Sequence, residues 1–179
     1  MRFPLKIGLI FAASWIAFKM LALAINWSTN DIRFFVFVNM LFITTAASFS
    51  IYKEKRANPD NPLLQDIKNG LLSSLPYALI VSVFLYFYYE KIYPEFNENK
   101  LREIELRLEE KKTIGELRSS NPDMENKTDV EIKKAVMENS RTIHSAKFTM
   151  ILSTLALMIY GTLNSIAISL IFRKVIFRQ

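Results

Sequence analysis

The chain has no cysteine, one histidine, four glycines and six prolines. The lack of cysteine excludes disulfides, thiol catalysis and thiolate metal sites. The single histidine, His144, has no acidic residues close by in the sequence that could complete a metal site, so we interpret it as an interfacial polar residue. The sequence also contains no P-loop, GxSxG, HExxH or dinucleotide-binding fingerprint. These absences favour a non-enzymatic protein, and they predict no catalytic residues, no metal site and no cofactor.

Long apolar runs dominate what is present. Hydrophobic residues make up 51% of the chain, and they are concentrated at 5–25, 34–52, 71–89 and 148–172. About 20 apolar residues in a helix cross the ~30 Å hydrocarbon core of a bilayer. The runs are continuous rather than alternating, which favours helices over barrel strands. The sequence therefore predicts an all-helical fold, a four-helix transmembrane bundle. A cleavable signal peptide ending near Ala22–Ala24 is an alternative for the first run, but its length and Lys19 favour a retained anchor.

Basic residues are distributed unequally among the connecting segments. The N-terminus, the 53–70 connection and the C-terminus, which includes Arg178, carry nine Lys and Arg residues against three acidic ones. The segment 90–147 has twelve basic and thirteen acidic residues. Because cytoplasmic loops are enriched in Lys and Arg, both termini and 53–70 are predicted to be cytoplasmic, and 94–147 to lie on the opposite, extracytoplasmic side of the membrane. We therefore interpret the net charge of +6 as favouring contact with anionic lipid rather than with nucleic acid.

These boundaries give three regions. Residues 1–93 hold the first three spans and the cytoplasmic 53–70 loop, 94–147 form an extracytoplasmic charged segment, and 148–179 hold the fourth span and a cytoplasmic tail.

The segment 94–147 has the pattern of a helical hairpin. Leu101, Ile104 and Leu108 recur at three- and four-residue spacing among charged residues, whereas Leu106 lies off this stripe, which is typical of an amphipathic helix. Gly115 and the residues around Pro122 predict a turn.

A second helix is predicted to follow this turn. Thr128 and Glu131, in the sequence TDVE, have the spacing of a capping box. The apolar contacts of this second helix are predicted to be Val130, Val136 and Met137. The hairpin could be a solvated connector, or it could bind a protein partner or a second copy of the chain.

Lys19 is a charged residue within the first apolar run. An ammonium at the bilayer centre costs about 2.5–3.5 kcal/mol on insertion scales. The short connection between the first two runs predicts that Lys19 and Asn39 lie at similar depth, while Tyr86 and Glu90 lie at the outer end of the third run. These four residues define a possible intramembrane polar site, with Lys19 facing the bundle. Lys19 could hydrogen-bond Asn39 or a tyrosine while reaching the outer surface, or it could face a cavity that binds an anionic group.

The fourth run contains small residues at a regular spacing. Gly161, Ser165 and Ser169 repeat every four residues, which predicts a face for close helix packing within the bilayer.

The layout of the chain also resembles a known family. The third run ends in YYEKIYPEF, the charged segment contains TDVEIKKAVMENS, and the last run ends in GTLNSIAISLIFRK. In these features the chain resembles the bacterial domain of unknown function 4199 family, most closely at Tyr93–Phe96 and at Gly161–Ile171. The resemblance implies a small integral membrane protein with four spans in a bacterial inner membrane, which would make 94–147 periplasmic. It supplies no activity and no functional residues.

Two functions are compatible with these patterns. The first is a non-enzymatic structural, assembly or partner-binding membrane protein whose 94–147 segment makes the contact. The alternative is a small lipid- or anion-handling bundle that uses Lys19 in an intramembrane cavity.

Overall fold

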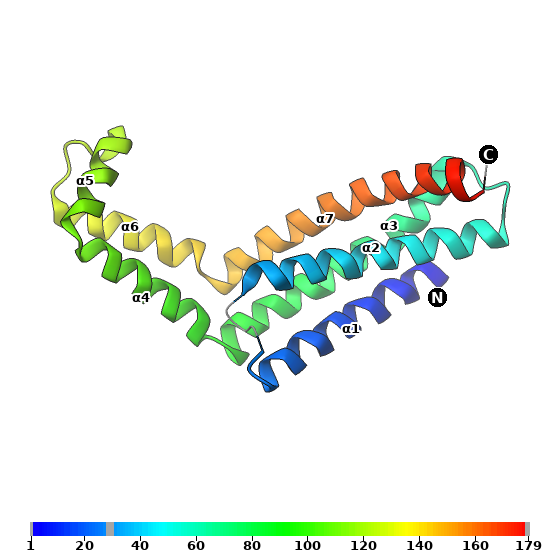
Figure 1. The fold of residues 1–179 in the computed structure, drawn as a ribbon, viewed down its shortest axis with the longest axis horizontal. Helices are drawn as coiled ribbons and strands as arrows, with labels where there is room; N and C mark the ends of the chain where they lie inside the picture. The colour runs from blue at the N-terminus through cyan, green and yellow to red at the C-terminus, as the bar shows by residue number, and fades with distance from the viewer. Residues whose placement is uncertain (1, 28–30, 178–179) are drawn as a thin grey trace. The chain divides into compact units, whose positions relative to one another are not determined.

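The computed structural model describes residues 2–27 and 31–177, and every regular element in these ranges is a helix (Figure 1). The long elements are α1 (Phe3–Ala24), α2 (Ile32–Ala57), α3 (Leu63–Phe87), α4 (Glu95–Glu109), α5 (Lys111–Ser120), α6 (Asp129–Ile143) and α7 (Ala146–Ile171). Three short helical elements complete the fold: η1 (Tyr88–Ile92), η2 (Pro122–Met124) and η3 (Phe172–Ile176). Unit 2 comprises Leu85–Met150, and the described residues before and after it form unit 1. Arg178 lies outside the described residues.

Four helices among the described residues are long and apolar enough to cross a membrane: Phe3–Ala24, Ile32–Ala57, Leu63–Ile92 and Ala146–Ile176. The prediction of an all-helical chain with four candidate spans is thereby confirmed. The connection between the second and third spans is shorter than the predicted 53–70, because α2 continues to Ala57 and α3 begins at Leu63. Both helices extend beyond their apolar runs because charged side chains in their end turns pair with one another, as described below.

The side chains of unit 1 are arranged for a lipid solvent. Large apolar side chains on the outside of the four long helices are at least half exposed, among them Leu21, Phe37, Leu79 and Leu163. Small side chains are fully buried between the helices, among them Ala12, Ala46, Ala47 and Ala78. Lipid tails are as apolar as leucine, so helices in a bilayer gain more from close packing of small residues than from burying large ones. Unit 1 follows this pattern.

Three glycines allow α3 to lie very close to α1 and α7. The contacts are Gly8 of α1 against Ser73, Gly70 against Ser165 of α7, and Gly161 of α7 against Ser74. A Cβ on Gly8 would collide with the Ser73 carbonyl oxygen, and a Cβ on Gly161 would lie 2.9 Å from the Ser74 Cβ. Since Ser165 and Ser169 are also fully buried, the small-residue face of the fourth span packs inside unit 1.

A defined backbone motif ends α1. Asn26 has a φ angle of 53°, a left-handed conformation that asparagine adopts more readily than most residues. The Trp27 N–H donates to the Ala22 carbonyl at 2.9 Å, and the Asn26 N–H donates to the Leu23 carbonyl at 3.0 Å. These two bonds form a Schellman motif. The motif satisfies carbonyls at the end of α1 and reverses the chain toward α2, which packs against α1.

Both chain ends of unit 1 gather with the connection between α2 and α3 (Figure 1). The Phe3 and Phe49 ring centroids are 6.1 Å apart, which joins the start of α1 to the end of α2. The Tyr52 and Phe172 centroids are 6.2 Å apart, which joins α2 to η3. The segments predicted to share one side of the membrane therefore lie at the same end of unit 1.

Unit 2 has a small core of its own. Its buried apolar side chains include Phe96, Leu108, Ile114 and Ile132, and α4 packs against α5 and α6. The predicted stripe on α4 is confirmed at Leu108, which is buried, and Leu106 points away with 59% of its surface exposed.

Two details predicted for this segment are wrong. Val130 is 75% exposed, because α6 turns its Ile132 and Val136 face inward and Val130 lies on the opposite side of the first turn. Gly115 lies inside α5 rather than in a turn, because its flanking residues continue the helix and its φ is not positive. The chain reverses instead at η2, which begins with Pro122.

The predicted capping box at the start of α6 is confirmed. The Glu131 N–H donates to Thr128 Oγ1 at 3.3 Å, and the Thr128 N–H donates to Glu131 Oε2 at 2.8 Å. Two hydrogen bonds from Thr128 lower the pKa of the Glu131 carboxyl. The larger effect comes from the Thr128 backbone N–H and the smaller one from the Thr128 hydroxyl.

Gly8→Ala and Gly115→Ala should change stability in opposite directions. Gly8→Ala forces a methyl group against the Ser73 backbone, and overpacking of this kind costs about 1–3 kcal/mol. Gly115 has open space where a Cβ would lie, so Gly115→Ala should gain about 0.5–1 kcal/mol of helix stability. Thermal unfolding of the full chain in mild detergent measures both. Equal effects of the two substitutions would contradict the close α1–α3 contact.

The capping box makes the start of α6 sensitive to pH. Since the folded pKa of Glu131 is below its unfolded value, the stabilisation is fully present above the unfolded pKa of about 4.3 and is lost as pH falls through the folded pKa. Hydrogen-exchange protection of the first α6 amides, corrected for intrinsic rates, should therefore decrease below about pH 4. In Glu131→Gln, protection should be lower at neutral pH and should lose this pH dependence. Glu103→Gln on α4 is the control and should retain it.

Candidate functional site

Lys19 is buried inside the chain, with 3% of its surface exposed. It lies on the face of α1 that also carries Ala12, Trp15 and Ala22, all buried. Its ammonium nitrogen is 3.3 Å from the ring centroid of Phe35 on α2. A cation over an aromatic face is attracted by the negative face of the ring, and the attraction strengthens when water is excluded. This ring contact is one way in which the helix pair offsets the cost of the charge.

Asn39 lies one helical turn after Phe35, on the same face of α2, and is also buried. Its Oδ1 accepts a hydrogen bond from the Tyr77 hydroxyl of α3 at 2.5 Å. Tyr77 is fully buried, so this bond satisfies two polar groups that would otherwise be costly in an apolar interior. The contact described for Lys19 is thus with the Phe35 ring, and the contact described for Asn39 is with the Tyr77 hydroxyl.

Tyr86 and Glu90, the other two residues of the predicted polar site, belong to unit 2. Tyr86 is half-buried at the end of α3, and its ring packs edge-on against Phe87 with centroids 5.3 Å apart. Glu90 is exposed in η1.

A second polar contact joins α2 to α7. The Thr44 and Tyr160 hydroxyls are 3.1 Å apart, and the Asn164 side-chain amide donates to Thr44 Oγ1 at 3.0 Å. Short hydrogen bonds between spans stabilise helix association in a bilayer by about 1 kcal/mol each. These three side chains hold α2 and α7 together, because their polar groups hydrogen-bond to one another.

A buried ion cluster lies where α2 ends and α3 begins. Lys55 in the last turn of α2 and Asp66 in the first turn of α3 are each 1% exposed, and the Lys55 Nζ is 3.7 Å from Asp66 Oδ2. Arg173 of η3 donates through Nε to the same carboxylate oxygen at 2.9 Å. Lys55 and Arg173 both also donate to the Asn61 carbonyl. The cluster therefore ties three helix ends and the connecting loop together.

The position of each charge in the cluster follows from the helix dipoles. Cations are favoured in the last turn of a helix and anions in the first turn, which is where Lys55 and Asp66 lie. Buried ions are costly unless paired, and removal of one partner leaves an uncompensated charge. Two cations share one carboxylate here, so Asp66 is the residue on which the cluster depends.

Sequence reasoning missed this cluster because it assigned Lys55, Asp66 and Arg173 to loops and a tail. A signal for it exists in the third helix. From Asp66 onward, polar or small residues recur at helical spacing on one face, namely Asn69, Gly70, Ser73, Ser74 and Tyr77, and all of them are buried. A polar stripe on an otherwise apolar span marks the face that contacts other helices.

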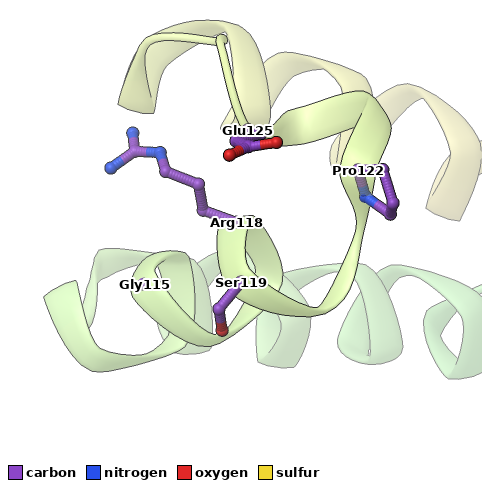
Figure 2. Close-up of a pocket in the computed structure, with 5 residues that line it drawn as sticks. All are labelled: Gly115, Arg118, Ser119, Pro122 and Glu125. Atoms are coloured by element: carbon purple, nitrogen blue, oxygen red, sulfur yellow. The ribbon is translucent and has the colours of Figure 1, made fainter.

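Unit 2 carries a pocket of about 380 Å³ at the turn between α5 and η2 (Figure 2). Its lining residues are Gly115, Arg118, Ser119, Pro122 and Glu125. The Arg118 guanidinium is already engaged, because it donates to Asp129 Oδ1 at 2.5 Å and to the Lys127 carbonyl at 3.1 Å. Within the part of the chain that is described, no cluster of His, Cys, Asp and Glu could hold a metal ion. The one guanidinium at the pocket is therefore committed to contacts within unit 2.

The fold and these contacts define an all-helical protein with four candidate membrane spans and a compact charged unit. A family model described as "Protein of unknown function (DUF4199)" matches residues 6–174, and the chain belongs to this family. No curated protein and no solved structure matches the chain. The stretch Tyr93–Phe96, which carries part of the family resemblance, joins η1 to α4, and its Tyr93 and Phe96 ring centroids lie 6.2 Å apart.

Asp66→Asn should destabilise unit 1 strongly. The substitution leaves Lys55 and Arg173 without a counter-charge, and loss of one partner from a buried pair costs about 3–5 kcal/mol. Asp60→Asn removes an exposed acid from the same connection and should change stability by less than about 0.5 kcal/mol. Thermal unfolding of the two variants in mild detergent compares them. If both unfold at the wild-type temperature, the cluster does not hold unit 1 together.

Proposed function

We propose that this protein is a non-enzymatic inner-membrane protein whose four long helices form a bundle that presents the 94–147 segment as a helical hairpin on the extracytoplasmic side. The hairpin contacts a protein partner or a second copy of the chain. The termini and the connection between α2 and α3 face the cytoplasm in this arrangement.

The observation that carries this proposal is the compactness of unit 2. A slack connector between two spans needs no core, yet this unit buries Phe96, Leu108, Ile114 and Ile132 and caps α6 with reciprocal hydrogen bonds. Chain ordering costs about 1–2 kcal/mol of conformational entropy per residue. A folded unit with a fixed charged surface can be recognised by a partner, whereas a segment that only connects two spans has no need for such a surface.

Two exposed apolar side chains on this unit support a contact role. Leu106 on α4 is 59% exposed and Val130 on α6 is 75% exposed, each among charged neighbours. Apolar side chains within a charged surface supply the desolvated part of a protein interface, while the surrounding charges supply specificity.

The sidedness rests on charge. The end of unit 1 where the termini gather carries Arg2, Lys6, Lys53, Arg56 and Lys174, all exposed, and anionic cytoplasmic lipid attracts each such residue by about 1 kcal/mol. Unit 2 is close to neutral overall, so it is the part that crosses at lower cost.

A second candidate function is lipid or anion handling by the bundle through Lys19. The burial of Lys19 between α1 and α2 favours it. The Phe35 ring that covers the ammonium weighs against it, because a ligand would have to replace that contact.

The absence of native cysteine makes single-cysteine variants a direct test of the proposed function. Leu106→Cys and Val130→Cys should react with a membrane-impermeant maleimide in intact cells. Lys53→Cys should react only after the inner membrane is permeabilised. The reverse pattern would overturn the sidedness.

The same variants test the contact role when they are labelled with a maleimide–diazirine crosslinker and irradiated. Leu106→Cys and Val130→Cys should give discrete adducts, at twice the mass of the chain for a second copy or at another mass for a protein partner. Lys53→Cys, labelled after permeabilisation, is the control. Equal adducts at Lys53, or none at either unit 2 position, would contradict a contact surface on unit 2.

A further inference from the structure

A polar pocket lies within unit 1, at the end where α1 begins, α2 ends and α3 begins. Its volume is about 390 Å³, and its lining includes Arg2, Phe3, Glu54, Gln65, Lys68 and Asn69. Within the contacts described above, none of these side chains takes part in the ion cluster or in the Lys19–Phe35 contact. The pocket is therefore separate from the polar groups described above and from unit 2.

Asn69 gives this pocket a chemical preference. The residue is 3% exposed, and its Oδ1 accepts a hydrogen bond from Gln65 Nε2 at 3.2 Å. Its Nδ2 is buried and has no hydrogen-bond partner among the described residues. A buried donor without an acceptor costs about 1–3 kcal/mol. Because Asn69 lines the pocket, an acceptor that enters the pocket would relieve this cost.

The charges around the pocket favour an anion with one negative charge. Among the lining side chains, Arg2 and Lys68 supply two positive charges and Glu54 supplies one negative charge, so one positive charge remains. The N-terminal turns of α1 and α3 meet here as well, and the N-terminal end of a long helix carries partial positive charge that favours phosphate. A phosphodiester carries a single negative charge and several acceptor oxygens, which match the net charge and the free Asn69 donor.

The position of the pocket suits a lipid. It lies at the ends of three candidate membrane spans, which is the level of lipid headgroups. Phe3 supplies an apolar wall beside the charged side chains, as the junction between a headgroup and its acyl chains requires.

We propose that this pocket binds a phosphate-bearing group, with Asn69 Nδ2 donating to a phosphate oxygen and with Arg2 and Lys68 neutralising its charge. The phosphodiester of a membrane lipid headgroup is the source that fits the depth of the pocket, and a soluble phosphate ester shares its chemistry. This assignment is independent of the partner role proposed for unit 2.

The test measures binding to the full chain in a neutral detergent by native mass spectrometry. The probes are dioctanoyl phosphatidylglycerol, dioctanoylglycerol, which lacks the phosphate, and glycerophosphoglycerol, the soluble phosphodiester that lacks the acyl chains. Wild-type protein should bind the phospholipid saturably and should not bind dioctanoylglycerol. Lys68→Met and Asn69→Leu should each weaken phospholipid binding by about tenfold or more, because each removes a direct hydrogen bond or charge.

Lys174→Met is the matched control, since it removes an exposed cation from the same end of unit 1 without touching the pocket. Its binding should stay within about twofold of wild type. Lys68 is exposed, so Lys68→Met keeps the test decisive even if Asn69→Leu fails to fold. Glycerophosphoglycerol that binds as tightly as the lipid, with the same sensitivity to Lys68→Met, would support the site and assign it to soluble phosphodiesters.

Three results would overturn the proposal. The first is that neither phosphate probe binds wild-type protein saturably. The second is that Lys174→Met weakens binding as much as Lys68→Met does, which would indicate general attraction to a basic surface. The third is that binding is lost in Lys19→Met and retained in Lys68→Met, which would locate the ligand at Lys19 instead.

Discussion

The close approach of α3 to α1 and α7 is the constraint on which unit 1 depends. In water, helices associate because they bury apolar surface, but that gain is absent between helices that are already in lipid. What remains is dispersion between closely packed backbones and hydrogen bonds that lipid cannot supply. Gly8, Gly70 and Gly161 provide the first, each at a position where a methyl group would be too close to its neighbour. The Asn39–Tyr77 and Thr44–Asn164 contacts provide the second.

Polar residues within the spans serve different purposes according to their depth. Several in the middle contact another polar group or an aromatic ring, as Tyr77 does with Asn39 and Lys19 does with Phe35. Those at the helix ends carry full charges, and the Lys55–Asp66–Arg173 cluster fixes the geometry of that end. Asn69, close to this cluster in the sequence, lines a pocket and has a buried amide donor with no hydrogen-bond partner among the described residues. This difference separates residues that hold the fold from a residue that is available to a ligand.

The sequence predicts the architecture well where one strong physical rule decides it. Four long apolar runs favour membrane-spanning helices, and TDVE specifies a cap through local bonding alone. The helix ends are less predictable, since an apolar run marks the membrane-embedded part of a helix, while Lys55 and Asp66 extend α2 and α3 through a long-range pairing. Gly115 and Val130 show the same limit. A weak local preference for a turn or for burial is overridden by the packing of neighbouring residues.

The candidate polar site was predictable only in part. Lys19 and Asn39 stand out as polar residues in apolar runs, whereas Phe35 looks like any aromatic residue at a span end, and Tyr77 is one of several tyrosines. Which ring covers the lysine depends on how α1 and α2 rotate about their axes, and the sequence does not specify that rotation. Asn69 was hidden for a different reason, because it lay in a stretch taken for a loop.

The ion cluster also bears on how the chain assembles during synthesis. α1 and α2 are joined by a short connection and can enter the bilayer as a pair. Asp66 follows Lys55 closely in the sequence. Arg173, in contrast, comes 107 residues after Asp66. Until it emerges from the ribosome, the carboxylate has one cation instead of two, and Gly70 and Ser74 have no α7 to cover them. Completion of the cluster therefore requires the fourth span, and a chain that stops before Arg173 leaves the Asp66 carboxylate paired with Lys55 alone.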